Sequence, residues 1–386
     1  MSMRKYWWVL FIIVIIVFVI GVEKNKKGDI TLTGTMKNLA IERITMIHQE
    51  GARPRFAPDG KSFAFDRKNK DGYYDVYISD LEGNIIQSVT EGKGGITQRN
   101  NGNPTFDSTG GYLIFISEEN DHLLDNQKYL ADPGVGLFSN LYAADLKNGQ
   151  FWQLTNIPIK KTFTDRIPAT ATVNPHFSKD GKTLIWTERY AEGGNNNWGR
   201  WRLKAADFVI ENRQPTVRNE RVVFTPTEGT YVTFMGQLDS VHWVVSGNLD
   251  GQHEYGMDQY VLNITTKKYT NLTNTSEYWE EDSSITPSGR IIYMSNADSR
   301  YEFDFSKNWV SQPTERDYYS MNADGSDKQR LTYFNQEGAP EYLGYRVLAV
   351  AADVSPDGKY LVSTLGYDFG KKKRDVVLKI ALITFK

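Results

Sequence analysis

Short runs of alternating apolar and polar residues, separated by turn residues, fill most of this chain. The clearest example is Arg53–Phe65, where two apolar runs flank the turn sequence Pro58-Asp59-Gly60-Lys61. Alternation with a period of two is typical of a half-buried β-strand. Glycine after aspartate supplies the positive φ that two-residue hairpin turns require, and proline before it ends the ladder of the incoming strand. The stretch therefore predicts a β-hairpin with a tight Asp-Gly turn.

The hairpin recurs along the chain, for example at Asn174–Lys182 and Asp353–Leu361. Two further short strands follow the first copy, at Asp75–Asn84 and Ile85–Thr90. Recurrence in one local context indicates a repeat architecture more strongly than any single turn does. Six repeats of this kind can be traced from Arg53 onward. The fourth lacks an Asp-Gly first turn, and its strands are expected at Tyr231–Met235, Val241–Ser246, Gln259–Asn263 and Lys268–Thr273.

The sixth repeat ends after its third strand, Val376–Thr384. A donor for the missing strand is Ile41–Met46, which is similar to the fourth-strand endings Gln153-Leu154-Thr155 and Arg330-Leu331-Thr332. Pairing Ile41–Met46 with Val376–Thr384 would close a ring and remove the open sheet edge. We therefore predict an all-β fold, a six-bladed β-propeller over residues 38–386.

Two of these motifs resemble the WD40-like repeats of the TolB family. They are Ser355-Pro356-Asp357-Gly358-Lys359 and Tyr319–Ser326 followed by Arg330-Leu331-Thr332. The resemblance implies a six-bladed β-propeller in an exported bacterial protein that binds other proteins. The same repeats occur in propellers fused to prolyl-oligopeptidase-type hydrolases, so the motif is specific for fold and much less so for function. The α/β domain that precedes the propeller in the protein naming the family has no counterpart in this sequence.

An uninterrupted apolar run, Trp7–Val22, lies near the N-terminus. As a helix it would span roughly 24 Å, somewhat less than a hydrocarbon core of about 30 Å. Arg4 and Lys5 precede the run, and no clear small-x-small cleavage site follows it. We predict an uncleaved signal-anchor helix in residues 1–22 and a polar tether in residues 23–37, with the propeller on the periplasmic or extracellular side of the cell membrane. A removed signal peptide and a buried β-strand are the alternatives.

Composition excludes several classes of function. The formal net charge is −2, which gives no global basic field for nucleic acid. There are no cysteines, which excludes disulfides, thiol catalysis and cysteine-based metal sites. The five histidines form no metal-ligand pair at i,i+4, and there is no Gly-x-Ser-x-Gly nucleophile motif or phosphate-binding glycine loop. We expect no cofactor and no bound metal.

The predicted blade topology places the longest connections at one end of the propeller, which we call the long-connection end. Long connections on a rigid scaffold are frequent binding sites. Aromatic, guanidinium, amide and carboxylate groups are the chemical types expected in such a site. The candidate binding residues are Trp198 and Arg200 in one connection, Trp279, Glu281 and Asp282 in another, and the strand residues Arg53, Asn103, Asn174 and Asp353. The four strand residues and Asp282 occupy matching positions at the start of innermost strands and would ring the channel mouth.

Structural roles are alternatives for these residues. Trp201 would pack between blades, Tyr278–Asp282 would be a solvated face, and the ring residues would hydrogen-bond the neighbouring connections. The leading functional hypothesis is a non-catalytic scaffold that binds a protein or peptide partner at the long-connection end. The first alternative is an enzyme acting on glycans or peptides with carboxylates at the channel mouth. A purely structural assembly module is the second.

Overall fold

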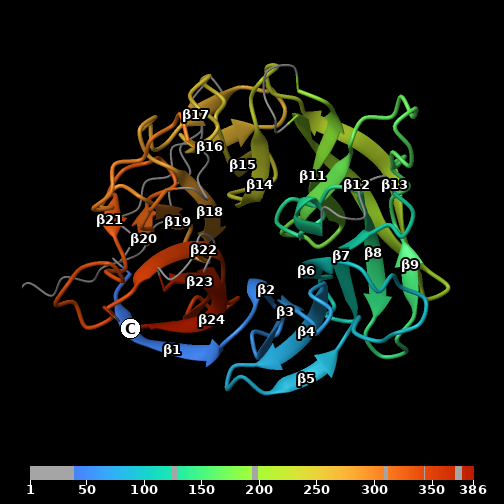
Figure 1. Ribbon diagram of the computed structural model, residues 1–386, viewed down its shortest axis with the longest axis horizontal. Helices are drawn as coiled ribbons and strands as arrows, with labels where there is room; N and C mark the ends of the chain where they lie inside the picture. The colour runs from blue at the N-terminus through green and yellow to red at the C-terminus, as the bar shows by residue number, and fades with distance from the viewer. Residues whose placement is uncertain (1–38, 123–127, 194–198, 308–311, 343, 370–375) are drawn as a thin grey trace, which may run out of the picture. The chain divides into compact units, whose positions relative to one another are not determined.

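Six antiparallel sheets of four strands each are arranged around a central axis (Figure 1). The computed structural model describes residues 39–386 except 123–127, 194–198, 308–311, 343 and 370–375. In five sheets the strands are consecutive in the chain, and the sixth has the order β1-β24-β23-β22. This topology confirms the predicted six-bladed β-propeller.

Each blade takes its innermost strand first and its outermost strand last, except that β1 is the outermost strand of blade six. Blade one contains β2 (Ala52–Phe56), β3 (Ser62–Lys68), β4 (Tyr74–Asp80) and β5 (Ile85–Ser88); blade two β6 (Asn101–Phe106), β7 (Tyr112–Glu118), β8 (Ser139–Asp145) and β9 (Phe151–Gln153); blade three β10 (Ala171–Phe177), β11 (Thr183–Ala191), β12 (Arg200–Glu211) and β13 (Gln214–Phe224). Blade four contains β14 (Val232–Gln237), β15 (His242–Gly247), β16 (Asp258–Asn263) and β17 (Tyr269–Asn271); blade five β18 (Glu280–Ile285), β19 (Ile291–Ser295), β20 (Asp317–Met321) and β21 (Gln329–Arg330); blade six β22 (Arg346–Val354), β23 (Tyr360–Asp368), β24 (Val376–Phe385) and β1 (Ile41–His48).

The ring closes where the first strand of the chain meets the last. β1 pairs antiparallel with β24, with Ile44 opposite Ile383 and Met46 opposite Ala381. Gly51 then leads into blade one, and its N–H donates to the carbonyl of Leu378 at 3.0 Å. A Cβ at Gly51 would lie 2.8 Å from the Phe65 ring, so no larger residue fits this close approach. The predicted pairing of Ile41–Met46 with Val376–Thr384 is confirmed.

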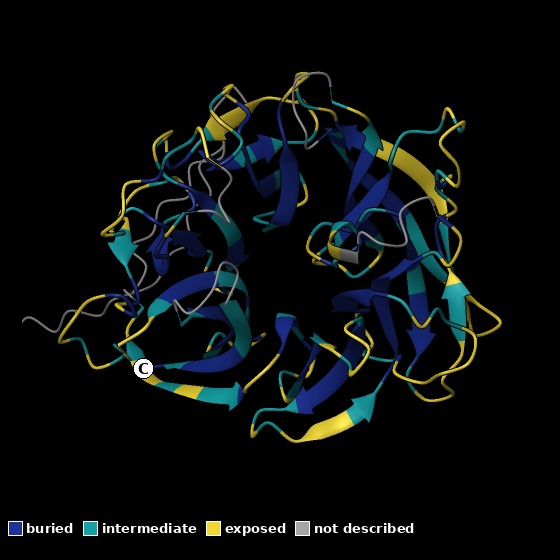
Figure 2. Cartoon of the chain, in the orientation of Figure 1, coloured by how far each residue is buried: buried dark blue, intermediate teal, exposed yellow. Residues whose placement is uncertain are grey.

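Apolar side chains fill the spaces between neighbouring blades. Phe56, Phe63 and Phe65 of blade one pack with Ile380 and Leu382 of blade six in one cluster of buried residues. Figure 2 shows the same pattern around the ring, with buried inner and middle strands and exposed residues concentrated on the outer strands and the connections. Burial between blades explains why second strands such as β7 and β19 are apolar on both faces instead of strictly alternating.

The first turn of a blade differs from the predicted two-residue turn. In blade one the Ala57 N–H donates to the Ser62 carbonyl at 2.9 Å and the Gly60 N–H to the Ala57 carbonyl at 2.9 Å, so five residues separate β2 from β3. Only Gly60 has a positive φ, at 67°. The Asp59 carboxylate instead accepts from the Lys61 N–H at 2.9 Å. The aspartate therefore stabilises a longer turn through its side chain, as Asx turns do.

Blade three contains the two-residue turn that was expected elsewhere. Asn212 and Arg213 join β12 to β13 and have φ values of 52° and 65°. Because both residues are in the left-handed region, the two strands continue through a long hairpin. The fourth strand of this blade consequently begins at Gln214.

In the part of the chain that the structure describes, no helix is long and apolar enough to cross a membrane. The predicted anchor at Trp7–Val22 and the tether at 23–37 lie outside the described residues.

Candidate functional site

Four of the predicted ring residues share an unusual backbone conformation. Arg53, Asn103, Asn174 and Asp282 have φ values of 51°, 53°, 54° and 50°. Each lies at an irregularity in the pairing between the first and second strands of its blade. A bulge adds a residue to one strand and redirects the side chains beside it. The repeat thus places one bulged residue of each of these blades at the same height near the axis.

Asp353 does not occupy the matching position, which corrects the prediction. Arg53 precedes the turn glycine Gly60 by seven residues, whereas Asp353 precedes Gly358 by five. Its equivalent in blade one is therefore Arg55, and its equivalent in blade three is His176. These three residues are nevertheless brought together at the axis.

Arg55 connects three blades. Its guanidinium lies 3.4 Å from the Asp353 carboxylate of blade six and donates to the Asn174 side-chain oxygen of blade three at 3.2 Å. The His176 Nε2 lies 2.7 Å from the same guanidinium. Burial and the nearby Arg55 charge lower the pKa of His176 well below its usual value, so the ring is neutral and accepts from Arg55. The Asp353 carboxylate also accepts from the Phe56 N–H at 2.8 Å.

A second ion pair joins blade one to blade two. Arg53 donates twice to the buried Asp66 carboxylate, with both distances at 2.8 Å. Asp66 also accepts from the Asn103 N–H at 2.8 Å, and Arg53 lies 3.3 Å from Asp132 in the connection between β7 and β8. Burial raises the pKa of Asp66 to about 6 against the opposing charge of Arg53, so the carboxyl is ionised at neutral pH. The alternative role in which ring residues bind neighbouring connections is therefore realised at Arg53.

Glu281 and Asp282 form a carboxyl pair at the start of β18. Burial raises the pKa of both groups, and the neighbouring Asp282 charge raises the pKa of Glu281 further, to about 8. Three guanidinium groups act in the opposite direction on Asp282, namely Arg316, Arg55 and Arg53. Asp282 is thus within electrostatic range of the ion pairs described above, and the pair retains a proton near neutral pH.

Trp279 is part of the core, although its sequence context suggested an exposed residue. It is 5% exposed and packs against Tyr255 with ring centroids 5.1 Å apart. Its indole N–H donates to the Glu281 carboxylate at 3.0 Å, and the Arg316 guanidinium lies 3.9 Å from its ring centroid. The acidic and aromatic segment Tyr278–Asp282 contacts a cation of its own chain, Arg316. Tyr278–Asp282 is therefore not the fully solvated face considered as an alternative.

Of the two remaining predicted residues, the structure describes Arg200, which is away from these contacts. Arg200 begins β12, is partly exposed and forms an ion pair with Glu228 in the connection after β13. Trp198 lies outside the described residues. Trp201 is buried with its ring 5.3 Å from that of Tyr231, so the structural alternative for this residue is confirmed.

Sequence reasoning missed a set of exposed aromatic residues in the long connections. Their exposed fractions range from 38% for Tyr333 to 85% for Phe163. Tyr301 and Tyr345 gather near the connections of blades five and six, since Arg346 lies 5.6 Å from the Tyr301 ring and Tyr345 packs on Phe369 at 5.0 Å. The full set is Tyr129, Phe163, Tyr301, Tyr333 and Tyr345. Nothing in their local sequence distinguishes them from buried tyrosines.

The raised pKa of Glu281 predicts a pH dependence of stability. Between pH 4.5 and 8 the folded state holds a proton on this carboxyl that the unfolded state has lost. The free energy of unfolding is therefore expected to fall as pH rises through this window. Glu281→Gln should reduce the difference in free energy of unfolding between pH 4.5 and pH 8 by roughly 1–3 kcal/mol, because one pKa unit corresponds to about 1.4 kcal/mol and Arg316 offsets part of the shift. Denaturant unfolding of both proteins at pH 4.5 and 8 measures it. An unchanged difference between the two pH values would contradict the assignment.

Among the described residues, no group of three or more His, Asp or Glu side chains is placed to hold a metal ion. Nor do the contacts around Arg55 and Arg53 contain a serine or threonine paired with a histidine base. The chemistry available near the axis is that of buried carboxyls and guanidinium groups.

Comparison with solved structures finds similar chains at low sequence identity. An oligogalacturonate lyase in complex with manganese is 14% identical, with 90% of this chain and 96% of that chain aligned and a TM-score of 0.47. TolB from Acinetobacter baumannii is 13% identical over 87% of this chain and 64% of that chain, with a TM-score of 0.46. An oligogalacturonate lyase from Vibrio parahaemolyticus is 12% identical over 90% and 96%, with a TM-score of 0.46. No family model and no curated protein matches the sequence.

Proposed function

We propose that this chain is a non-catalytic scaffold that binds a protein or peptide partner at the long-connection end of its propeller. The partner would contact the connections and the polar groups that begin the innermost strands. Of the predicted residues, Arg200 would take part directly, Trp198 is retained as a surface contact, and Arg53, Asn103, Asn174, Asp282 and Asp353 would set the charge at the centre of the site. Trp279 and Glu281, which are joined by a hydrogen bond, would hold Asp282 in position.

The observation that carries this proposal is the location of the exposed aromatic side chains. Five of the six aromatic residues that are clearly exposed in the described part of the chain lie in connections at one end of the propeller. The sixth, Tyr269, lies on the outer strand β17. Tyrosine and phenylalanine are enriched at protein interfaces because they bury a large area with little loss of side-chain entropy. Their concentration at one end of a rigid ring favours a binding face there.

We further propose that the propeller is exported and held at the cell membrane by the apolar run Trp7–Val22. As a helix the run would cross most of the hydrocarbon core, and the polar residues 23–37 would separate the propeller from the lipid surface. Fractionation of cells expressing the full chain tests this directly. Recovery in the membrane fraction, with the propeller degraded by protease added from outside the inner membrane, is expected; recovery in the soluble cytosol would contradict it.

Site-specific photocrosslinking in living cells tests the binding face. A photoreactive phenylalanine analogue replaces Tyr301 or Phe163 in the full-length chain, and the matched control carries it at Tyr269. Adducts with another protein are expected from the first two positions and not from the control. Equal adducts from all three positions, or none from any, would contradict the proposal. Adducts with only a second copy of this chain would instead favour an assembly module.

One observation favours a second candidate, an enzyme acting on glycans or peptides. A carboxyl with a pKa of about 8 beside a second carboxyl is protonated at neutral pH and can serve as a general acid. In that case Glu281→Gln and Asp282→Asn should each abolish turnover on a panel of anionic glycans and peptides. Absence of turnover by the unmodified chain, together with specific adducts at Tyr301, would decide for the scaffold.

A further inference from the structure

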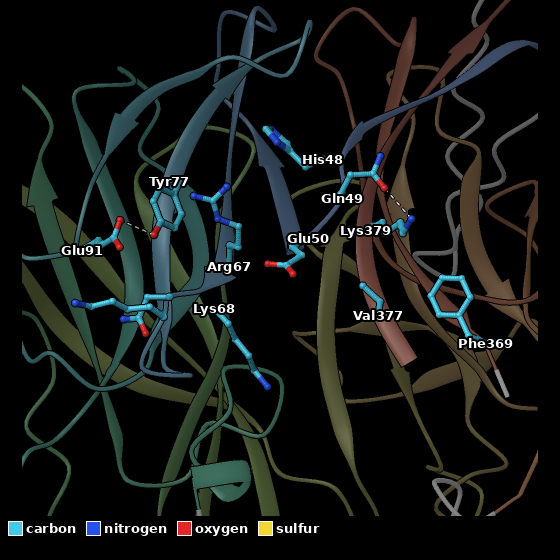
Figure 3. Close-up of a pocket in the computed structure, with 12 residues that line it drawn as sticks. His48, Gln49, Glu50, Arg67, Lys68, Tyr77, Glu91, Phe369, Val377 and Lys379 are labelled. Atoms are coloured by element: carbon cyan, nitrogen blue, oxygen red, sulfur yellow. Dashed lines mark hydrogen bonds between the residues drawn. The ribbon is translucent and has the colours of Figure 1, made fainter. Parts of the chain in front are cut away.

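A cavity of about 560 Å³ lies where the propeller ring closes, between blade one and blade six (Figure 3). Blade one contributes Arg67 and Lys68 from the end of β3 and Lys70 from the following turn. Blade six contributes Lys379 from β24 and Phe369, which directly follows β23. In Figure 3 Arg67 and Lys68 lie across the cavity from Lys379 and Phe369. The volume of the cavity is within the range of small-ligand sites.

Among the described residues, four cations and two carboxylates line this cavity. The cations are Arg67, Lys68, Lys70 and Lys379, and the carboxylates are Glu50 and Glu91. Glu91 already accepts from the Tyr77 hydroxyl at 2.8 Å. His48 also lines the cavity but adds no charge at neutral pH, because burial and the adjacent Arg67 lower its pKa to about 4. The lining therefore carries a net positive charge.

None of the four cations has a carboxylate within ion-pair distance in the described part of the chain, in contrast to Arg53 and Arg55 at the axis. Arg67 lies over the Tyr77 ring, 4.4 Å from its centroid. The Lys379 ammonium donates to the Gln49 side-chain oxygen at 2.7 Å and lies 4.9 Å from the Tyr367 ring. These contacts hold Arg67 and Lys379 in place without neutralising their charge.

Uncompensated cations on opposite walls of one cavity repel each other, and an anion placed between them removes that repulsion. Arginine binds carboxylate and phosphate through two parallel donors, and lysine acts as a point charge beside it. The apolar surfaces of Phe369 and Val377 line the blade-six side. A ligand that meets all these groups carries more than one negative charge on a small organic frame.

We propose that this cavity, the closure cavity, binds a small organic polyanion bearing two or more carboxylate or phosphate groups. The ligand contacts Arg67 and Lys68 of the first blade and Lys379 of the last, and thereby bridges the two blades that the β1–β24 pairing joins. Because it binds only the closed ring, it stabilises closure in proportion to its occupancy. Lys70, Glu91 and Phe369 lie in connections at the long-connection end, so the cavity is beside the binding face proposed above. The polyanion site does not depend on the function proposed for that face.

Calorimetric titration of the full-length chain with citrate and, separately, with inorganic pyrophosphate tests the site. At least one of the two is expected to bind with a stoichiometry of one and a Kd of roughly 1 mM or lower, a weak but specific affinity. Binding of citrate alone identifies a carboxylate ligand, binding of pyrophosphate alone a phosphate ligand, and binding of both the general class. Failure of both to bind would overturn the proposal.

Variants distinguish the cavity from a diffuse surface field. Arg67→Gln and Lys379→Gln should each weaken binding about tenfold or more, because each removes a charge-assisted hydrogen bond. Arg67→Lys should retain part of the affinity, which excludes loss of fold as the cause. The matched control is Lys61→Gln, at the opposite end of the same hairpin, with unchanged binding expected. Equal weakening by Lys61→Gln, or none by the two cavity variants, would overturn the assignment.

Hydrogen exchange provides an independent readout of the bridge. A saturating polyanion should slow amide exchange in Ile41–His48 of the wild-type chain, since this strand is the element that closure holds in place. It should leave exchange in β17 of blade four unchanged. Binding without slower exchange in Ile41–His48 would contradict the bridging role.

Discussion

A chain that lacks residues 1–48 is expected to lose cooperative unfolding altogether. The deletion removes β1 and exposes the edge of β24, whose residues Ile380–Ile383 are buried. It also removes Ile41, Ile44 and Met46, which pack against a large core cluster that includes Leu361, Ala381 and Ile383 of blade six. The combined loss should exceed about 5 kcal/mol, which is comparable with the total stability of many domains.

The matched control begins at Asn38 and keeps β1 while removing the apolar run and the tether. It should unfold in one transition in denaturant. The slope of the free energy of unfolding against denaturant concentration should correspond to exposure of the whole core in that transition. The shorter chain should bind a hydrophobic dye and aggregate, because an open edge of Ile and Leu residues is a template for strand pairing. If both chains unfold with the same midpoint and slope, closure by β1 contributes nothing and this explanation is wrong.

Substitution of Asp66 by asparagine is the second change with a large expected effect. Asp66 accepts two hydrogen bonds from Arg53 and one from the Asn103 N–H, and its carboxylate is fully buried. Asp66→Asn keeps the shape but leaves the Arg53 guanidinium without its nearest counter-charge. Removal of one partner of a buried pair costs about 3–5 kcal/mol, although Asp132 at 3.3 Å from Arg53 should offset part of this.

Equilibrium denaturation at neutral pH measures the effect of Asp66→Asn. Asp59→Asn makes the same chemical change on the exposed first turn of the same blade, where an amide oxygen can still accept from the Lys61 N–H. It should alter the free energy of unfolding by no more than about 0.5 kcal/mol. A similar small effect at both positions would show that the link between blades one and two is not held by this ion pair.

Closure of the ring could be predicted from the sequence because the last repeat lacks one strand and an extra strand precedes the first repeat. The last repeat stops after Val376–Thr384, and one strand of matching character, Ile41–Met46, stands before the first repeat. Pairing partners far apart in the chain were therefore recognisable without coordinates. The extended hairpin of blade three was not, since the Asn212-Arg213 turn carries no glycine and both residues adopt positive φ within the folded blade.

The candidate site was predictable only in part. Positions that recur at a constant distance from the turn glycine identified Arg53, Asn103, Asn174 and Asp282, whereas Asp353 was aligned by residue type and belongs with Arg55. Trp279 packs against Tyr255, Phe303 and the Arg316 guanidinium, which are distant from it in sequence and meet its ring only in the folded chain. Exposure of Tyr301 and Tyr345 likewise depends on how connections from different blades pack, which local patterns do not encode.

The most direct test of ring closure is a disulfide across the two terminal strands. Arg43 lies opposite Thr384, and the natural chain contains no cysteine, so Arg43→Cys with Thr384→Cys gives one pair without background. The control pair is Ile44→Cys with Thr384→Cys, in which the two side chains point to opposite faces of the sheet. Closure by β1 predicts rapid and nearly complete oxidation of the first pair and little of the second, measured by the shift in gel mobility. Equal oxidation of both pairs, or of neither, would contradict the closed six-bladed ring.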